Sequence, residues 1–175
     1  MTPTYHRIFM GEAVIHASNN PNITLVTNGL ISCIGFAGWE PQKKIGFLVH
    51  FGGPKQVKDF YSNGVEMLSK KCGVSDLSTF ICAIRGGYEK TPASQKILTA
   101  IKSDLLSHER IQFKIIDQTQ MSKSFAQKSL SIDCYKGQFT DYNIENDPSP
   151  RLKTPKEEAR DLTFSSIEEL VYRRS

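Results

Sequence analysis

Residues 33–50 read CIGFAGWEPQKKIGFLVH, which is two short apolar runs on either side of a polar loop that contains proline. Apolar runs of this length around such a loop are typical of a β-hairpin, so we expect residues 33–38 and 45–50 to be its two arms. If the loop is centred between Pro41 and Gln42, the first residue of one arm, Cys33, faces the last residue of the other, His50.

The two faces of this hairpin differ in the size of their side chains. Because side chains alternate along a strand, one face carries the large apolar residues and is the expected core face: Ile34, Phe36, Phe47 and Val49. The other face carries mostly small residues together with the cysteine and the histidine: Cys33, Gly35, Ala37, Gly46, Leu48 and His50. We expect this second face to be concave and open enough to admit a substrate.

A cysteine opposite a histidine has a specific chemical use. Directly opposed residues have Cβ atoms about 4.5–5.5 Å apart, and at that separation a thiol and an imidazole can share a proton. The thiolate is the effective nucleophile, and an imidazole accepts and returns protons near neutral pH. The alternative is that Cys33 is a small buried hydrophobic residue and His50 a structural histidine.

Three segments resemble the chemoreceptor glutamine deamidases, the CheD family: residues 8–14 (IFMGEAV), 27–34 (TNGLISCI) and 46–51 (GFLVHF). Thr27 precedes Cys33 by six positions and His50 follows it by 17, and both separations resemble those of the family. Weaker similarity in residues 80–87 and 111–117 extends the resemblance to about residues 7–143.

The sequence also departs from the family pattern at two places. Ile31 stands where the family has a glycine, and residues 118–120 (QTQ) stand where it has a glycine-rich segment. The expected protein substrate is a chemoreceptor-like protein or a different target protein, and these differences favour the second.

The resemblance implies a cysteine-dependent amidohydrolase that converts a glutamine side chain of a protein substrate into glutamate and ammonia through a thioester. In that reaction Cys33 is the nucleophile, His50 the general base and acid, and Thr27 the residue that orients the imidazole. Neither a cofactor nor a metal ion is expected. The backbone N–H groups of Ser32 and Cys33 are the candidate donors to the oxyanion, and Asn28 is an alternative orienting residue.

The remaining cysteines and histidines form no comparable set. His6, His16 and His108 are expected to be structural or solvated, and Cys82 lies in an apolar run typical of core. Cys72 follows two lysines that could lower its pKa, but no base accompanies it. The four cysteines contain neither a Cys-x-x-Cys pair nor zinc-finger spacing, so we expect reduced thiols and no metal site.

Length and composition exclude several classes of protein. With 175 residues, of which 39% are hydrophobic and 23% charged, the chain is long enough for one globular domain. Its formal charge of +4 comes without the basic clusters typical of nucleic-acid binding. We find neither a signal-peptide pattern nor an apolar run long enough for membrane insertion. The expected location is the cytoplasm, and delivery into a host cell would leave no pattern of its own.

Apolar periodicity and turn residues predict an α+β sandwich of mostly antiparallel β-sheet flanked by helices, and the resemblance implies that this sandwich is CheD-like. The expected deamidase domain spans residues 1–144, and a tail spans residues 145–175. Besides the hairpin, we expect strands at 8–16, 23–26, 79–84, 111–116, 130–135 and 138–142, and helices at about 57–71 and 91–106. The Asn28-Gly29 pair predicts a bend directly after Thr27.

The tail is expected to form short helices that dock on the body or on a partner through its apolar residues: Leu162, Phe164, Ile167, Leu170 and Val171. Three functions remain open from the sequence. The first is a protein-glutamine deamidase, the second another thiol hydrolase such as a protease or esterase, and the third a CheD-like binding module without catalysis.

Overall fold

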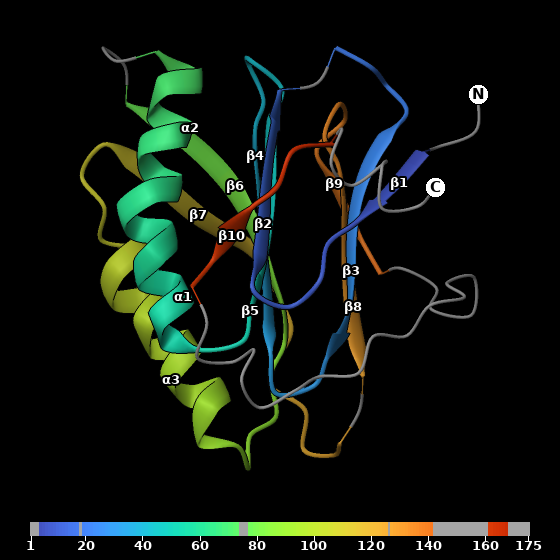
Figure 1. Ribbon diagram of the computed structural model, residues 1–175, viewed down its shortest axis with the longest axis vertical. Helices are drawn as coiled ribbons and strands as arrows, with labels where there is room; N and C mark the ends of the chain where they lie inside the picture. The colour runs from blue at the N-terminus through green and yellow to red at the C-terminus, as the bar shows by residue number, and fades with distance from the viewer. Residues whose placement is uncertain (1–3, 18, 74–76, 126, 142–160, 168–175) are drawn as a thin grey trace.

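The computed structural model describes residues 4–17, 19–73, 77–125, 127–141 and 161–167. They form one domain with three layers: a layer of helices, a six-stranded sheet and a four-stranded sheet (Figure 1). Most neighbouring strands in the two sheets run antiparallel. The expected α+β sandwich flanked by helices is therefore confirmed.

The six-stranded sheet is the middle layer and contains the hairpin. Its strand order is β10-β2-β5-β4-β6-β7. The bounds are β2 Glu12–Ala17, β4 Ile34–Glu40, β5 Ile45–Phe51, β6 Ser78–Gly86, β7 Ile111–Gln118 and β10 Thr163–Phe164. Strands β4 and β5 lie at its centre. Other layers cover both of their faces, so nearly all of their residues are buried.

The four-stranded sheet has the order β1-β3-β8-β9. Its strands are β1 Thr4–Arg7, β3 Ile23–Leu30, β8 Lys128–Asp133 and β9 Gln138–Thr140. The helix layer consists of two continuous helical segments, each with one π-helical turn. The first is α1 Pro54–Asp59, η1 Phe60–Gly64 and α2 Val65–Cys72, and the second is α3 Pro92–Ala100 and η2 Ile101–Leu105.

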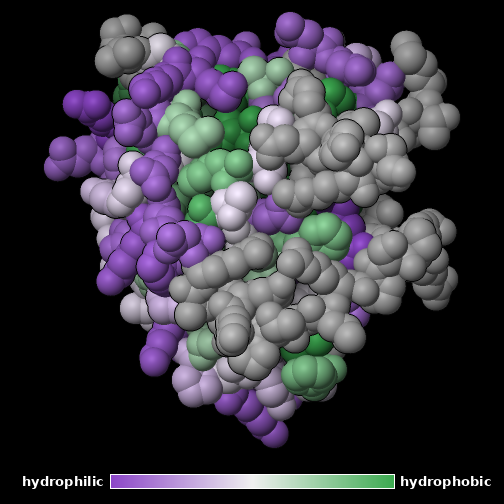
Figure 2. Space-filling model, in the orientation of Figure 1, coloured by the Kyte–Doolittle hydropathy of each residue, from purple (hydrophilic) through white to green (hydrophobic). Residues whose placement is uncertain are grey.

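The middle sheet separates two hydrophobic cores. The helix-side core is built around a cluster of phenylalanines, whose ring centroids lie 5.2–6.5 Å apart in pairs: Phe36, Phe47, Phe51, Phe60, Phe80 and Phe113. The inter-sheet core contains smaller residues, including Cys33, Ala37, Leu48 and Cys134. Hydrophilic side chains cover most of the outer edge of the helix layer in Figure 2.

The expected register of the hairpin is wrong by two residues. His50 pairs with Gly35, and Phe51 with Ile34, so Cys33 lies just before the paired part of β4. The cause is the turn, which begins after Glu40 because the Glu40 carboxylate accepts the backbone N–H groups of Gln42 and Lys43 at 3.2 and 2.7 Å. A shift of two residues keeps each side chain on its predicted face.

The small-residue face of the hairpin is not open, as we had expected it to be. It packs against the second sheet, and its glycines set the distance of approach. A Cβ atom on Gly46 would lie 2.7 Å from Cys134 Sγ, and one on Gly35 would lie 2.9 Å from Leu30 Cδ1. Small side chains on this face therefore allow two sheets to pack closely.

Three other predicted elements differ in the structure. Of the strand expected at 8–16, residues 8–11 lie outside the strands, and β2 begins at Glu12, directly after Gly11, which has a φ of 76°. The expected bend after Thr27 is absent because β3 continues to Leu30, with a change of register between Thr27 and Leu30. In the described part of the tail, residues 163 and 164 form a strand that was not predicted, and residue 167 is helical.

The tail segment that the structure describes packs on the body. Leu162 is buried in the helix-side core, Phe164 packs against the same core, and Ile167 packs against the inter-sheet core. The other two residues expected to dock, Leu170 and Val171, and the expected first helix of the tail lie outside the described residues. Within the described ranges, no helix is both long and apolar enough to cross a membrane.

Candidate functional site

Four strand ends meet at one edge of the sandwich, on the side away from the hairpin loop (Figure 1). Ile34 at the start of β4 pairs with Phe51 at the end of β5 and with Gly86 at the end of β6. The end of β3 leads through a short turn, residues 31–33, into β4. This edge therefore contains Cys33, His50 and the Gly86-Gly87 pair, with Thr27 on the facing sheet.

Thr27 and His50 are hydrogen-bonded across the interface between the two sheets. Thr27 Oγ1 lies 2.7 Å from His50 Nδ1 and 3.1 Å from the carbonyl oxygen of Ile8. A carbonyl can only accept, so the hydroxyl proton goes to Ile8 and the hydroxyl oxygen accepts from the ring N–H. This assignment puts the ring proton on Nδ1 and leaves Nε2 as the basic nitrogen.

The backbone around the histidine is held as well. The Gly11 N–H donates to the His50 carbonyl at 2.8 Å, from the chain segment that separates β1 and β2. Both His50 and Thr27 are buried, with exposed fractions of 3% and 0%. The segment 8–14 therefore supports both the histidine and the threonine.

Cys33 lies on the same face of the β4–β5 pair as His50, diagonally across from it. The residue directly opposite His50 is Gly35, two positions after Cys33. Diagonal neighbours are typically about 7–8 Å apart between Cα atoms, which is still within reach of long or aromatic side chains. The shared face was predicted correctly, whereas direct opposition was not.

The thiol of Cys33 is covered in this structure. Its exposed fraction is 2%, and Sγ lies 3.4 Å from Met10 Sδ, which is itself 7% exposed. The sequence placed Cys33 on an open face, and the second sheet closes that face. Met10 was not predicted as part of the site, because nothing in its local pattern indicates a contact 23 positions along the chain.

The carbonyl groups of Ser32 and of Cys33 itself both accept hydrogen bonds. Ser94 Oγ donates to the Ser32 carbonyl at 2.8 Å, and the Gly87 N–H donates to the Cys33 carbonyl at 3.0 Å. Gly86 has a φ of 92°, and a Cβ atom there would lie 2.5 Å from the Cys33 carbonyl oxygen. Only glycine permits this approach, so the sequence Gly86-Gly87 has a role beyond ending a strand.

The two candidate oxyanion donors, the N–H groups of Ser32 and Cys33, belong to this fixed turn. The alternative orienting residue, Asn28, has its side chain engaged elsewhere: its Oδ1 accepts from Arg7 Nη2 at 2.7 Å. Of the two candidate orienting residues, Thr27 is thus the one that contacts the imidazole.

A buried arginine shares the row of residues that contains the histidine. Arg85 on β6 faces Gly35, which in turn faces His50 on the other side. Its guanidinium donates to both carboxylate oxygens of Asp117 at 2.9 and 2.7 Å and lies 3.4 Å from Asp141 Oδ1. Burial lowers the pKa of Arg85, but the two carboxylates raise it by more, so the guanidinium keeps its charge. It is paired with Asp117 on β7 of the middle sheet and with Asp141, which directly follows β9 of the second sheet.

The other cysteines have environments that disfavour the thiolate. Burial raises the pKa of Cys72, and the lysines before it do not reverse this effect. Burial also raises the pKa of Cys82 well above its usual value and that of Cys134 to about 12, the latter with help from Asp133. These three thiols are structural.

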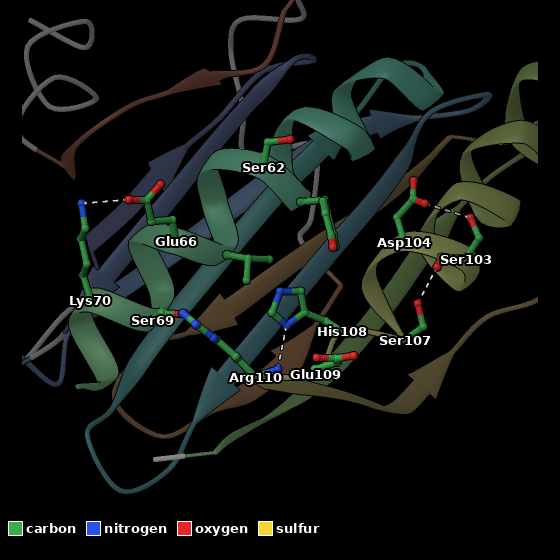
Figure 3. Close-up of a pocket in the computed structure, with 12 residues that line it drawn as sticks. Ser62, Glu66, Ser69, Lys70, Ser103, Asp104, Ser107, His108, Glu109 and Arg110 are labelled. Atoms are coloured by element: carbon green, nitrogen blue, oxygen red, sulfur yellow. Dashed lines mark hydrogen bonds and ion pairs between the residues drawn. The ribbon is translucent and has the colours of Figure 1, made fainter. Parts of the chain in front are cut away.

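A polar groove lies on the helix layer (Figure 3). Cys33 belongs to the inter-sheet core, on the other side of the middle sheet. The groove has a volume of about 800 Å³ and runs between α2 and the end of η2. His108 lines it, with Nδ1 accepting the backbone N–H groups of Arg110 and Ile111 at 3.1 Å. Burial and Arg110 lower the pKa of His108. None of the predicted catalytic residues lines this groove.

Within the described ranges, no group of three or more histidine, cysteine or acidic side chains is arranged to hold a metal ion. A scan of the chain against protein-family models and a search of curated proteins both found no match.

Proposed function

We propose that this protein is a cysteine-dependent amidohydrolase that deamidates glutamine side chains of a protein substrate. The observation that carries the proposal is the hydrogen bond of 2.7 Å between Thr27 Oγ1 and His50 Nδ1, on the face that also holds Cys33. The resemblance assigns the roles of nucleophile, base and orienting group to Cys33, His50 and Thr27, and these three residues lie at one end of the sandwich.

The proposed reaction has two halves. In the first, Cys33 Sγ attacks the carboxamide carbon while the thiol proton passes to His50 Nε2, and a tetrahedral intermediate with a negative oxygen forms. Ammonia leaves with the proton from His50, and a thioester remains. In the second, His50 deprotonates a water molecule that attacks the thioester carbon. The C–S bond breaks, glutamate is released, and the thiol regains its proton.

Access to the thiol is part of the proposal, because Cys33 is 2% exposed. Met10 Sδ lies 3.4 Å from the thiol sulfur, and a methionine side chain is unbranched and adaptable. We expect substrate to enter by displacing the Met10 side chain. Met10→Ala should therefore increase the rate at which small alkylating reagents modify Cys33, whereas Met10→Leu, which keeps the volume, should change it little.

Deamidation is tested directly by incubating the protein with candidate proteomes. Mass spectrometry should find glutamine residues that have gained roughly 1 Da, together with released ammonia, and Cys33→Ala should abolish both. Peptide fragments or released alcohols in place of that product would favour a protease or an esterase with the same residues.

One observation favours a second candidate, a binding module without catalysis. It is the burial of Cys33 among apolar residues of the inter-sheet core. The two candidates differ in the reactivity of the thiol. As a deamidase nucleophile beside a base, Cys33 should react with iodoacetamide at pH 7.5 before the three structural cysteines do.

The reference for this comparison comes from the other thiols. A pKa raised by burial lowers the thiolate fraction at neutral pH, and for Cys134, with a pKa of about 12, this fraction is below about 10⁻⁴ at pH 7.5. Peptide mapping after short exposure gives the order of labelling. If Cys33 reacts no faster than Cys72, the deamidase proposal fails and the binding module is favoured.

A further inference from the structure

Ser94 holds the peptide group between Ser32 and Cys33 through a hydrogen bond to its carbonyl. It lies in the first turn of α3, has an exposed fraction of 0%, and donates from Oγ to the Ser32 carbonyl at 2.8 Å. Its oxygen also accepts the Tyr88 N–H at 3.0 Å. Both contacts leave the helix, and the Ser94 side chain makes no cap for α3.

This contact fixes the direction of an N–H group. The described residues contain no cis peptide bond, and in a trans peptide the C=O and N–H point in opposite directions. The Ser32 carbonyl points at Ser94, so the Cys33 N–H, which belongs to the same peptide, points away from Ser94. The neighbouring Cys33 carbonyl is fixed independently by Gly87 at 3.0 Å.

We propose that Ser94 is a positioning residue, which holds the Ser32–Cys33 peptide so that the Cys33 N–H donates to the oxyanion formed when Cys33 is acylated. The inference rests on the proposed function to the extent that Cys33 is the nucleophile of an acyl transfer. A donor that is fixed in advance costs no reorganisation when the negative charge develops. Ser94 acts through the peptide and does not touch the substrate.

Two reagents separate this role from a general effect on the thiol. Iodoacetamide alkylates the thiolate by displacement at a CH₂ group, and no oxyanion forms. p-Nitrophenyl acetate acylates it: the sulfur bonds to the acetyl carbon, the C–O bond breaks, p-nitrophenolate leaves, and the thiol proton passes to His50. Peptide mapping of the Cys33 peptide measures both rates, with Cys33→Ala as the blank.

Ser94→Ala should lower the second-order rate of Cys33 acylation by about tenfold or more, because removal of one oxyanion donor costs about 10²–10³ and a misdirected donor retains part of that. Iodoacetamide alkylation should stay within about twofold of the wild-type rate, because that reaction needs no such donor. Ser94→Thr, which keeps the hydroxyl, should restore most of the acylation rate.

Equal losses in both reactions would show that Ser94 only supports the thiol, and unchanged acylation would show that it has no role. If Ser94→Ala does not fold, Ser94→Cys keeps the volume with a weaker donor and should show the same selective loss. A wild-type Cys33 that is alkylated but never acylated would refute acyl transfer itself, and the inference with it. Absence of glutamine deamidation with a selective loss would refute only the substrate class.

Discussion

The residue that orients His50 is a neutral hydroxyl, which distinguishes this arrangement from sets that use a carboxylate. Thr27 selects one tautomer of the imidazole because its own proton is committed to the Ile8 carbonyl. A hydroxyl supplies no negative charge, so it orients the neutral ring without forming an ion pair with the imidazolium. The tautomer is therefore the property of this site that depends most directly on Thr27.

Replacement of Thr27 should change that tautomer. In the wild-type protein, ¹⁵N chemical shifts of the His50 ring should report a proton on Nδ1. Thr27→Val keeps the shape but removes the acceptor, so we expect a mixture of tautomers and a loss of activity of about tenfold to a hundredfold. Thr27→Ser keeps the hydroxyl and is the matched control. A wild-type ring with its proton on Nε2 would contradict the assignment.

At the residue scale, the sequence, through the hairpin spacing and the family resemblance, selected Thr27, Cys33 and His50 as candidate site residues. It missed Met10 and Ser94, whose contacts with the site cross 23 and 62 positions of the chain. An isolated methionine or serine carries no local pattern that reveals such a contact. The burial of Cys33 was also unpredictable, because alternation along a strand gives the face of a residue but not what covers that face.

Among the elements, the hairpin β4–β5 both fills the helix-side core and determines how closely the two sheets pack. Its large residues fill the helix-side core, while its glycines let the second sheet approach. Gly46 is the clearest case, since an added Cβ would meet Cys134 at Sγ, Cβ and Cα within 3.4 Å. Cys134 directly follows β8, so its backbone has little freedom to move away from Gly46.

Gly46→Ala should therefore destabilise the fold. We expect a loss of about 1–3 kcal/mol in the free energy of unfolding, the usual range for overpacking, measured by urea denaturation. Cys134→Ala removes the closest atom, so the double variant should be more stable than the two single losses predict, with a coupling of at least about 0.5 kcal/mol. Strictly additive losses would show that the two sheets do not meet through this contact.

The elements differed in how well the sequence predicted them. The helices and the central strands followed from their apolar periodicity and their glycine and proline boundaries. The hairpin register depended on the Glu40 carboxylate, which binds two backbone N–H groups of the turn, and polar loop composition does not reveal such a contact. Residues 8–16 were predicted as one strand because their polar and apolar residues roughly alternate, whereas in the structure the chain turns at Gly11 and β2 begins at Glu12.

For the whole molecule, a segment from the end of the chain completes the middle sheet. β10 pairs with β2 in parallel, and Thr163 and Ser165 donate backbone N–H groups to Gly11 and Ala13 at 2.9 Å. Ser165 Oγ also donates to the buried carboxylate of Glu12 at 2.9 Å. The segment that supports the histidine backbone is thus itself held by the tail.

Leu162 should be the main apolar anchor of this segment. It is 8% exposed and belongs to the helix-side core, so Leu162→Ala should lower the free energy of unfolding by about 2 kcal/mol or more. Thr163→Ala is the matched control, because its side chain is exposed and its backbone bond to Gly11 survives; we expect a change below about 0.5 kcal/mol. Comparable effects of the two variants in urea denaturation would argue against docking of the tail.

The placement of β10 also bears on solubility. A strand at the edge of a sheet presents unpaired amide and carbonyl groups to any chain that can extend beside it. Here β10 covers part of that edge on β2. A molecule whose final segment has come away would present this part of β2 to another copy, and self-association would then compete with refolding. We therefore expect the pairing of β10 with β2 to disfavour association through this part of the edge.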